Sequence, residues 1–130
     1  MFSIKADRYD EIAIPYLNRA IPELASWEFS RLEPLLSPQG REIFKTEQGQ
    51  SIYRLFRQLG ELKSFDKPQY LSEKLNENDD RAGDINLVTY SVPAEFEAGP
   101  ALITLSLLVE GKTYSIYQFG IHSEIFADKL

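Results

Sequence analysis

The sequence predicts an α+β fold, in which N-terminal helices pack against a curved antiparallel sheet of about four strands. In the first half of the chain, apolar residues recur at intervals of three and four, as on one face of a helix. The second half alternates or runs apolar over residues 85–96, 101–110 and 113–125, with glycine in each junction. Strands joined by short turns pair antiparallel, and their apolar face must be covered. The helical half is therefore expected to cover the sheet.

The length indicates a single domain, and the composition excludes several kinds of functional site. The 130 residues suffice for one core and are too few for two ordinary domains. We expect a single domain over residues 1–130, with a helical part at about 7–62 and a sheet part at about 69–126. The net charge of −6 argues against nucleic acid as a partner, and the lack of cysteine excludes disulfides and thiolate zinc sites. No apolar run is as long as the roughly 18 residues of a membrane span.

The first helix is predicted from residue 7 by one apolar stripe. Pro15 and Pro22 lie off this stripe. An interior proline removes a backbone hydrogen bond, so we expect a kinked helix, or two pieces broken before Pro15. The stripe consists of Tyr9, Ile12, Ala13, Tyr16, Leu17, Ala20, Ile21 and Leu24.

Two further helices are predicted before the sheet. Ser30 and Glu33 fit a capping box for a short helix, with Ser26 as the alternative cap. Residues 37–40 are expected to form a loop. A longer helix follows over residues 41–62, with a break near Gly49 and a C-terminal cap at Gly60. The buried face of the short helix would consist of Leu32, Leu35 and Leu36.

The remaining segments complete the sheet. Residues 63–68 are expected to cross irregularly, residues 69–75 to form a weaker first strand, and residues 76–81 to form a polar turn rather than a calcium loop. In the last strand, Tyr114, Ile116 and Gln118 alternate against Tyr117, Phe119 and Ile121. Both faces of the sheet are thus partly apolar, and we expect a homodimer through the face that the helices leave free.

Glycine turns and aromatic positions recur in the second half, at residues 90–96, the Glu97-Ala98-Gly99-Pro100-Ala101 step, residues 102–105, the Glu110-Gly111-Lys112 turn, residues 114–117 and residues 119–123, and the helical half adds Ser26-Trp27 and Leu35-Leu36-Ser37-Pro38. Together they resemble the NTF2-like (cystatin-like, α+β cone) superfamily, and within it small bacterial proteins of unknown function. Tyr114 stands where that family usually has tryptophan. The resemblance implies helices on a curved sheet and says little about chemistry. Many such proteins are exported or lipid-anchored. The chain would be exported or periplasmic if Met1 replaces a removed signal peptide, and cytoplasmic if Met1 is native.

Tyrosines are the most suggestive candidates for a ligand pocket. Hydroxyls at the edge of an apolar cavity would orient a flat or acyl ligand. The alternative places the rings in the core and the hydroxyls in water. Trp27 is expected to anchor the helix junction rather than to stack on a ligand. The pocket candidates are Tyr53, Tyr70, Tyr90, Tyr114 and His122.

His122 is the single histidine of the chain, and a lone histidine near a strand end is either an acid–base group or a surface residue. It cannot form a histidine-based metal site alone, and no acidic pattern completes one. NTF2-like isomerases and dehydratases place a carboxylate or histidine beside a tyrosine inside the cone, but none of their motifs maps onto this chain. We therefore assign no catalytic residue, metal or cofactor.

Two function hypotheses follow. The first is a non-enzymatic module that binds a small apolar ligand between helices and sheet, or associates through its sheet. The alternative is a cofactor-free isomerase, dehydratase or hydrolase that uses the same cavity. A buried acid or His122 beside a tyrosine hydroxyl in a closed pocket would favour the enzyme. A filled core with an apolar outer sheet face would favour the interaction module.

Overall fold

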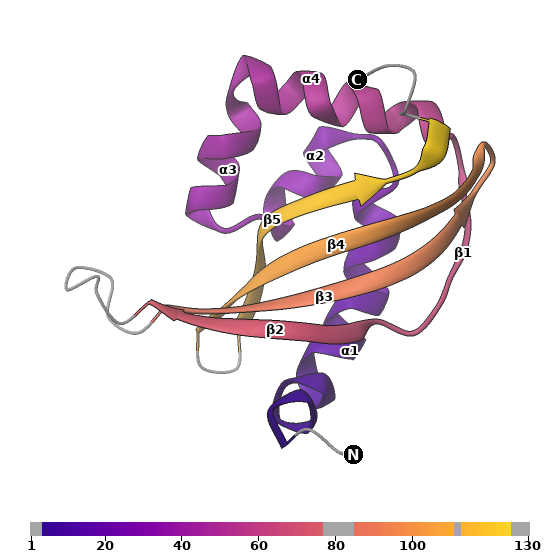
Figure 1. The fold of residues 1–130 in the computed structure, drawn as a ribbon. Coiled ribbons are helices and arrows are strands. Elements are labelled where there is room, and N and C mark those ends of the chain that lie inside the picture. Colours follow the sequence, from indigo (N-terminus) through magenta and orange to yellow (C-terminus); the bar gives the residue numbers. More distant parts are fainter. Residues whose placement is uncertain (1–3, 77–84, 111–112, 126–130) are drawn as a thin grey trace.

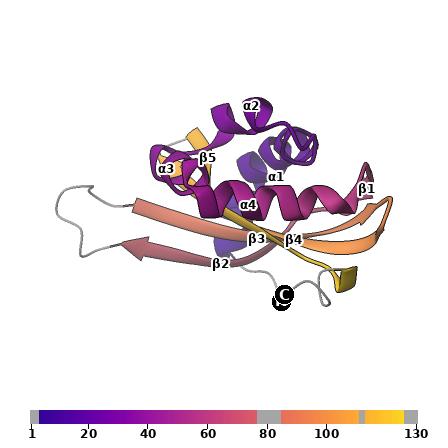
Figure 2. The ribbon, with the colours of Figure 1, turned by 90° about the horizontal axis from the view of Figure 1, so that it is seen from above.

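The structure, a computed structural model, describes residues 4–76, 85–110 and 113–125 and confirms the α+β class. A layer of helices covers one face of a curved, unclosed antiparallel sheet, and the other face carries no helix (Figures 1 and 2). The helical layer consists of α1 (Ile4–Leu24), α2 (Phe29–Leu32), α3 (Pro38–Lys45) and α4 (Glu47–Phe56), with 3₁₀ turns η1 (Glu33–Leu35) and η2 (Arg57–Leu59). The sheet consists of β1 (Leu62–Phe65), β2 (Gln69–Asn76), β3 (Ile85–Phe96), β4 (Gly99–Glu110) and β5 (Thr113–His122).

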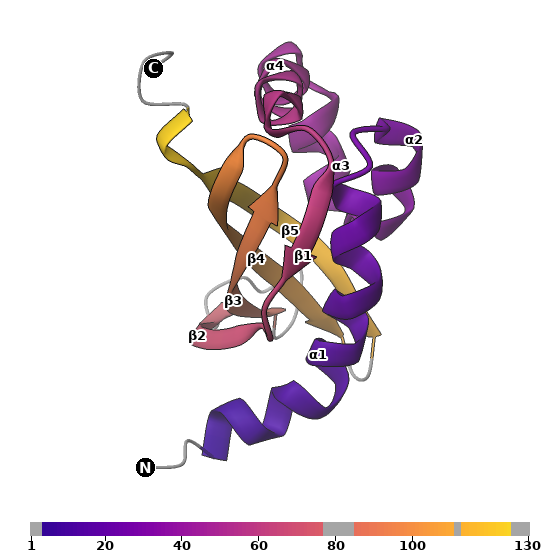
Figure 3. The ribbon, with the colours of Figure 1, turned by 90° about the vertical axis from the view of Figure 1, so that its right-hand side faces the viewer.

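Helix α1 contains both prolines without ending at either. Pro15 and Pro22 are exposed, so the apolar stripe still faces the sheet. The helix bends along its length and wraps the curved sheet (Figure 3). The expected kink is thus confirmed, and the alternative of two separate pieces is wrong. Pro15 and Pro22 have no N–H to bond the preceding turn, and interior prolines of this kind kink a helix.

The helix starts after α1 differ from those predicted. The cap of α2 is Glu28, which makes no side-chain cap hydrogen bond, so neither Ser30 nor Ser26 caps it. The expected loop at residues 37–40 is instead the first turn of α3. Ser37 is its N-cap, and the Ser37 hydroxyl accepts a 3.0 Å hydrogen bond from the Gly40 N–H. A serine followed by proline matches the N-cap and N1 preferences of a helix, and this signal outweighs the loop signal.

The long helix predicted over residues 41–62 is divided at Thr46 rather than at Gly49. The Thr46 hydroxyl accepts a 3.0 Å hydrogen bond from the Gly49 N–H, which places Gly49 inside the first turn of α4. The expected C-cap at Gly60 is confirmed, with a φ of 79°. Only glycine adopts this region without a steric penalty.

Trp27 joins the first two helices in an unusual conformation. Its φ is 62°, which is uncommon for a bulky residue. The indole N–H donates a 2.7 Å hydrogen bond to the Gly60 carbonyl, and the ring centroid lies 5.7 Å from that of Tyr53 and 5.9 Å from that of Phe96. Trp27 therefore anchors the helix junction, as expected from the sequence.

Strand β1 was not predicted, because residues 63–68 were expected to be irregular. It pairs with the end of β3, while β2 pairs with the beginning of β3, so the two short strands share one neighbour. Asp66 lies between them. Its side chain is exposed, and its N–H donates a 2.8 Å hydrogen bond to the Pro93 carbonyl. The polar turn expected at residues 76–81 lies, except for Asn76, outside the described residues.

Helices cover one face of the sheet, here called the covered face, and this face forms the hydrophobic core. A bulge in β5 corrects the predicted alternation of its last residues. The register shifts between Ser106 and Leu107, so Tyr117 is the extra residue. One extra residue in a strand shifts the alternation of the side chains after it to the opposite faces of the sheet. The covered face therefore carries Tyr90, Val92, Ile103, Leu105, Tyr114, Ile116, Phe119 and Ile121.

The centre of the opposite face, here called the open face, carries uncharged side chains that are half-buried or exposed, whereas the exposed Glu95 and Glu110 continue the same alternation at the ends of β3 and β4. On it, Leu102 pairs with His122, Thr104 with Gly120, and Ser106 with Gln118. The open face is the set Thr89, Ser91, Pro93, Leu102, Thr104, Ser106, Gln118, Gly120 and His122.

Candidate functional site

A tyrosine–carboxylate cluster lies where α1 crosses β2 and β3 on the covered face. It consists of Tyr9, Asp10, Tyr70, Glu73 and Tyr90. The Tyr9 and Tyr70 rings stack at 6.3 Å with 7° between their planes, and the Tyr70 and Tyr90 rings meet edge to face at 6.0 Å. Both geometries are favourable for aromatic pairs.

Two hydroxyl–carboxylate hydrogen bonds join α1 to the sheet in this cluster. The Tyr90 hydroxyl donates to Asp10 Oδ1 at 2.5 Å, and the Tyr9 hydroxyl donates to Glu73. Tyr90 is fully buried. Its burial, followed by the neighbouring Asp10 carboxylate, raises the Tyr90 pKa far above its ordinary value. Tyr90 is therefore a neutral phenol that can only donate to the carboxylate.

Tyr114 and Asn86 extend the polar character of this end of the covered face. Both belong to one row across the sheet, since Val109 pairs with Asn86 on one side and with Tyr114 on the other. Burial and then Asp10 raise the Tyr114 pKa. The Asn86 Oδ1 atom is buried and has no hydrogen-bond partner among the described residues. An unsatisfied buried acceptor costs about 1–3 kcal/mol.

Tyr53 lies away from this cluster and has a structural role. Its ring is 5% exposed, and its hydroxyl donates a 2.7 Å hydrogen bond to the carbonyl of Leu24, the last residue of α1. Burial raises the Tyr53 pKa to about 12. The carbonyls at a helix end lack partners within the helix, and Tyr53 supplies one.

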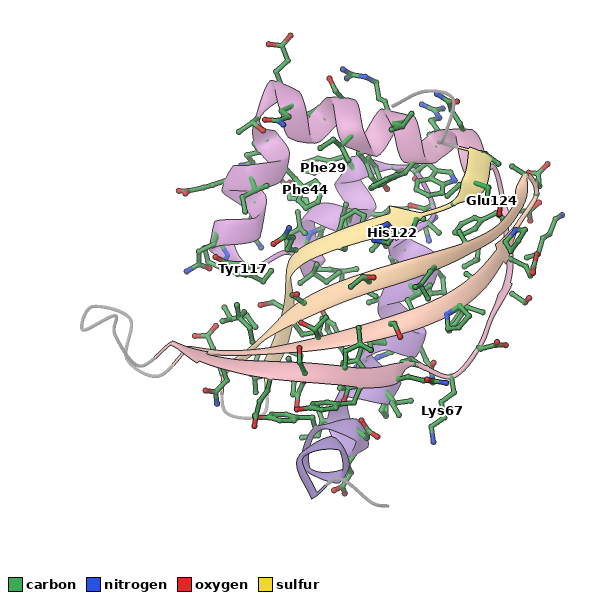
Figure 4. The ribbon with its side chains drawn as sticks, viewed as in Figure 1. Phe29, Phe44, Lys67, Tyr117, His122 and Glu124 are labelled. Carbon is green, nitrogen blue, oxygen red and sulfur yellow. The ribbon has the colours of Figure 1, made fainter. Side chains whose placement is uncertain are left out.

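His122 lies on the open face, so the sheet separates it from the tyrosine cluster (Figure 4). It borders an open hollow of ≈ 330 Å³ on β4 and β5. A Cβ built on Gly120 would meet nothing within 4 Å, so the missing side chain opens this hollow. The hollow is lined by Thr104, Ser106, Gln118, Phe119, Gly120 and His122.

The five pocket candidates thus divide among three places. Tyr70, Tyr90 and Tyr114 lie together on the covered face, whereas Tyr53 and His122 lie elsewhere. The space between the helices and the sheet around them is filled by side chains with no exposed surface. These include Leu17, Ile21, Leu32, Tyr90, Ile103, Leu105, Leu107 and Ile116.

Sequence reasoning missed both carboxylates of the cluster. Asp10 lies in the first turns of α1, where negative charge is expected from the helix dipole alone, and it is 80 residues away from Tyr90. Glu73 lies 64 residues from Tyr9. The pairing of Glu73 with Val88 places it on the covered face, and the alternation of β2 was the one available signal for this position.

Comparisons of the chain with protein-family models, curated proteins and solved structures found no match. Among the described residues, no group of histidine, aspartate and glutamate side chains is arranged to hold a metal ion. No helix in the same part of the chain is long and apolar enough to cross a membrane.

Proposed function

We propose that the protein is a non-enzymatic association module that acts through the open face of its sheet and forms a homodimer. The observation that carries this proposal is the contrast between the two faces. The covered face is packed into the core, whereas the open face leaves Leu102 40% exposed beside an open hollow. Leu102 pairs with Pro93 of β3, so the two form one small apolar patch on this face, and apolar patches on a sheet surface mark contact sites.

The charge distribution supports self-association. The chain carries 14 Lys and Arg and 20 Asp and Glu residues, for a net charge of −6, so two copies repel each other overall. The open face as defined above contains no carboxylate, lysine or arginine. Two copies that meet through this centre keep the Glu95 and Glu110 carboxylates at its ends, and depletion of charge is typical of the centre of protein interfaces.

The size of the open face favours weak association. The nine residues of the open face span five positions on each of three strands, which at about 3.3 Å per residue and about 4.8 Å between strands gives an area on the order of 250 Å². A standard interface covers about 800 Å² per partner, and smaller ones are transient. We therefore expect a weak, transient homodimer.

The test compares two arginine substitutions that change the net charge equally. Leu102 on the open face and Ile52 on α4 are both 40% exposed. We expect sedimentation velocity to show a dimer for the wild type and for Ile52→Arg, and a monomer for Leu102→Arg. A wild type that stays monomeric at high micromolar concentration would refute the proposal, as would equal behaviour of the two variants.

A second candidate function is supported by the tyrosine–carboxylate cluster. A small ligand with an N–H or O–H donor would satisfy Asn86 Oδ1, in the row that also holds Tyr114. The neutral Tyr90 hydroxyl beside Asp10 is the kind of pair that a cofactor-free isomerase or dehydratase would use. Native mass spectrometry tests this candidate. If this candidate holds, the spectrum shows a bound mass that denaturation releases and that Asn86→Leu loses, and a bare wild-type protein contradicts it.

A further inference from the structure

We propose that in the homodimer Leu102 of each copy inserts into the hollow over Gly120 of the other. This inference rests on the proposed function and specifies how the two open faces fit together. The two positions are diagonal neighbours on adjacent strands, since Leu102 pairs with His122 and Thr104 pairs with Gly120. One presents an exposed apolar side chain, and the other presents open space where a side chain would stand.

Symmetry requires that such a contact be made twice. In a two-fold dimer, when residue i of one copy contacts residue j of the other, j also contacts i. For two copies of one sheet face to meet, the axis must lie in the plane between the sheets. An axis that crosses the line from Leu102 to Gly120 at its midpoint and at a right angle places Leu102 of each copy over Gly120 of the other. A single two-fold axis therefore produces both contacts. The face is therefore self-complementary at Leu102 and Gly120.

Strand geometry fixes which other residues lie near this axis. Adjacent strands about 4.8 Å apart and a rise of about 6.6 Å per two residues separate Leu102 from Gly120 by about 8 Å. The bisecting axis then passes within about 2 Å of both Thr104 and His122, each of which faces its own counterpart in the second copy. Gln118 lies two residues further along β5, and the same geometry places it about 19 Å from its counterpart.

The same axis predicts how the two sheets cross. It runs at about 54° to the strands, so the strands of the two copies cross at about 70°, close to the orthogonal class of sheet packing. Contact is then confined to the region where β4 and β5 of one copy cross β4 and β5 of the other. The small side chains there permit a close approach, and the Thr89 and Ser106 hydroxyls already pair at 3.1 Å within one copy.

Filling the hollow should abolish the dimer without harming the fold. The Gly120→Leu side chain enters open space in the monomer but occupies the place of the incoming Leu102. We expect Gly120→Leu to be monomeric in sedimentation velocity with a thermal midpoint no lower than that of the wild type. The double variant Leu102→Ala, Gly120→Leu exchanges the two roles, so we expect it to recover the dimer.

Crosslinking gives an independent measure of the axis. The natural chain has no cysteine, so a single introduced thiol reports on one position. With a short bismaleimide, we expect Thr104→Cys to form covalent dimers and Gln118→Cys to remain uncrosslinked at the same protein concentration. Both positions belong to the open face, so exposure to the reagent does not explain a difference between them.

The outcomes separate this inference from the proposed function. If the wild type dimerises and Leu102→Arg abolishes the dimer, but Gly120→Leu still dimerises, the open face associates in another arrangement and the insertion of Leu102 is refuted. Crosslinking at Gln118→Cys instead of Thr104→Cys refutes it likewise. A wild-type monomer at high micromolar concentration refutes both. Dimer loss in Gly120→Leu with recovery in the double variant supports the insertion.

Discussion

Replacing Tyr53 by phenylalanine removes one hydrogen bond that closes the end of α1. The Tyr53 hydroxyl donates to the Leu24 carbonyl at 2.7 Å, and the side chain is only 5% exposed. Loss of the hydroxyl leaves the Leu24 carbonyl without this donor in a largely dry environment. We expect Tyr53→Phe to lower the free energy of unfolding by about 1–2 kcal/mol at pH 7.

The pH dependence of the same variant provides a sharper test. Burial raises the Tyr53 pKa to about 12 in the folded protein, against about 10 for an unfolded tyrosine. The stabilisation by the neutral phenol is fully present below pH 10 and is lost as the pH rises towards 12, because the unfolded chain releases this proton first. Two pKa units correspond to a loss on the order of 2 kcal/mol. Tyr53→Phe has no phenol at this position and does not lose this stabilisation. The free energy of unfolding of the wild type should therefore fall towards that of the variant between pH 10 and pH 12.

Urea unfolding followed by circular dichroism, at pH 7 and at several values between pH 10 and 12, measures both effects. Tyr117→Phe is the control, because its hydroxyl has no hydrogen-bond partner among the described residues, and we expect a change within about 0.5 kcal/mol. A gap between wild type and Tyr53→Phe that stays constant from pH 7 to pH 12 would refute the reasoning. Equal stability of the two proteins at pH 7 would refute it as well.

Three further substitutions, with Gly120→Ala as the control for the first, test the packing of the helices on the sheet by thermal or urea unfolding. In Gly40→Ala, the new Cβ would stand 2.7 Å from the Ile116 carbonyl oxygen, so we expect a loss of about 1–3 kcal/mol, whereas Gly120→Ala should cost less than about 1 kcal/mol. Ser37→Ala removes the N-cap of α3 and should cost about 1 kcal/mol, and an unchanged midpoint would show that the cap is dispensable. Tyr90→Phe deprives the α1 carboxylate of a charge-assisted donor and should cost about 1.5–3 kcal/mol, and a more stable variant would contradict the assigned hydrogen bond.

The sequence alone determined the elements whose pattern is local. Alternation predicted β3 over Ile85–Phe96 at its observed bounds, and β2 and β4 within one or two residues at each end. One apolar stripe predicted α1 despite its two prolines. These patterns are readable because burial of one face imposes its period on consecutive residues.

Elements with few residues and distant partners could not be predicted. Strand β1 has four residues, and its pairing with Phe96, Glu95 and Ala94 gives it a ladder that its own composition does not indicate. The start of α3 at Ser37 carried a readable cap signal that was interpreted as a loop. Strand β1 could not be predicted because it depends on tertiary pairing with β3. The start of α3 was missed because the cap signal and the loop signal compete at the same residues.

The candidate sites depend on contacts that only the tertiary structure decides. Asp10 reaches Tyr90 across 80 residues because α1 bends over the sheet. The single extra residue Tyr117 shifts the alternation of β5, so Phe119 enters the core while Gly120 opens the hollow on the other face. A period of two can be read from a sequence, but the position of a bulge depends on the register with the neighbouring strand. The sequence by itself therefore determined the layers of this protein, and the register of β4 and β5 decided which side chains each face presents.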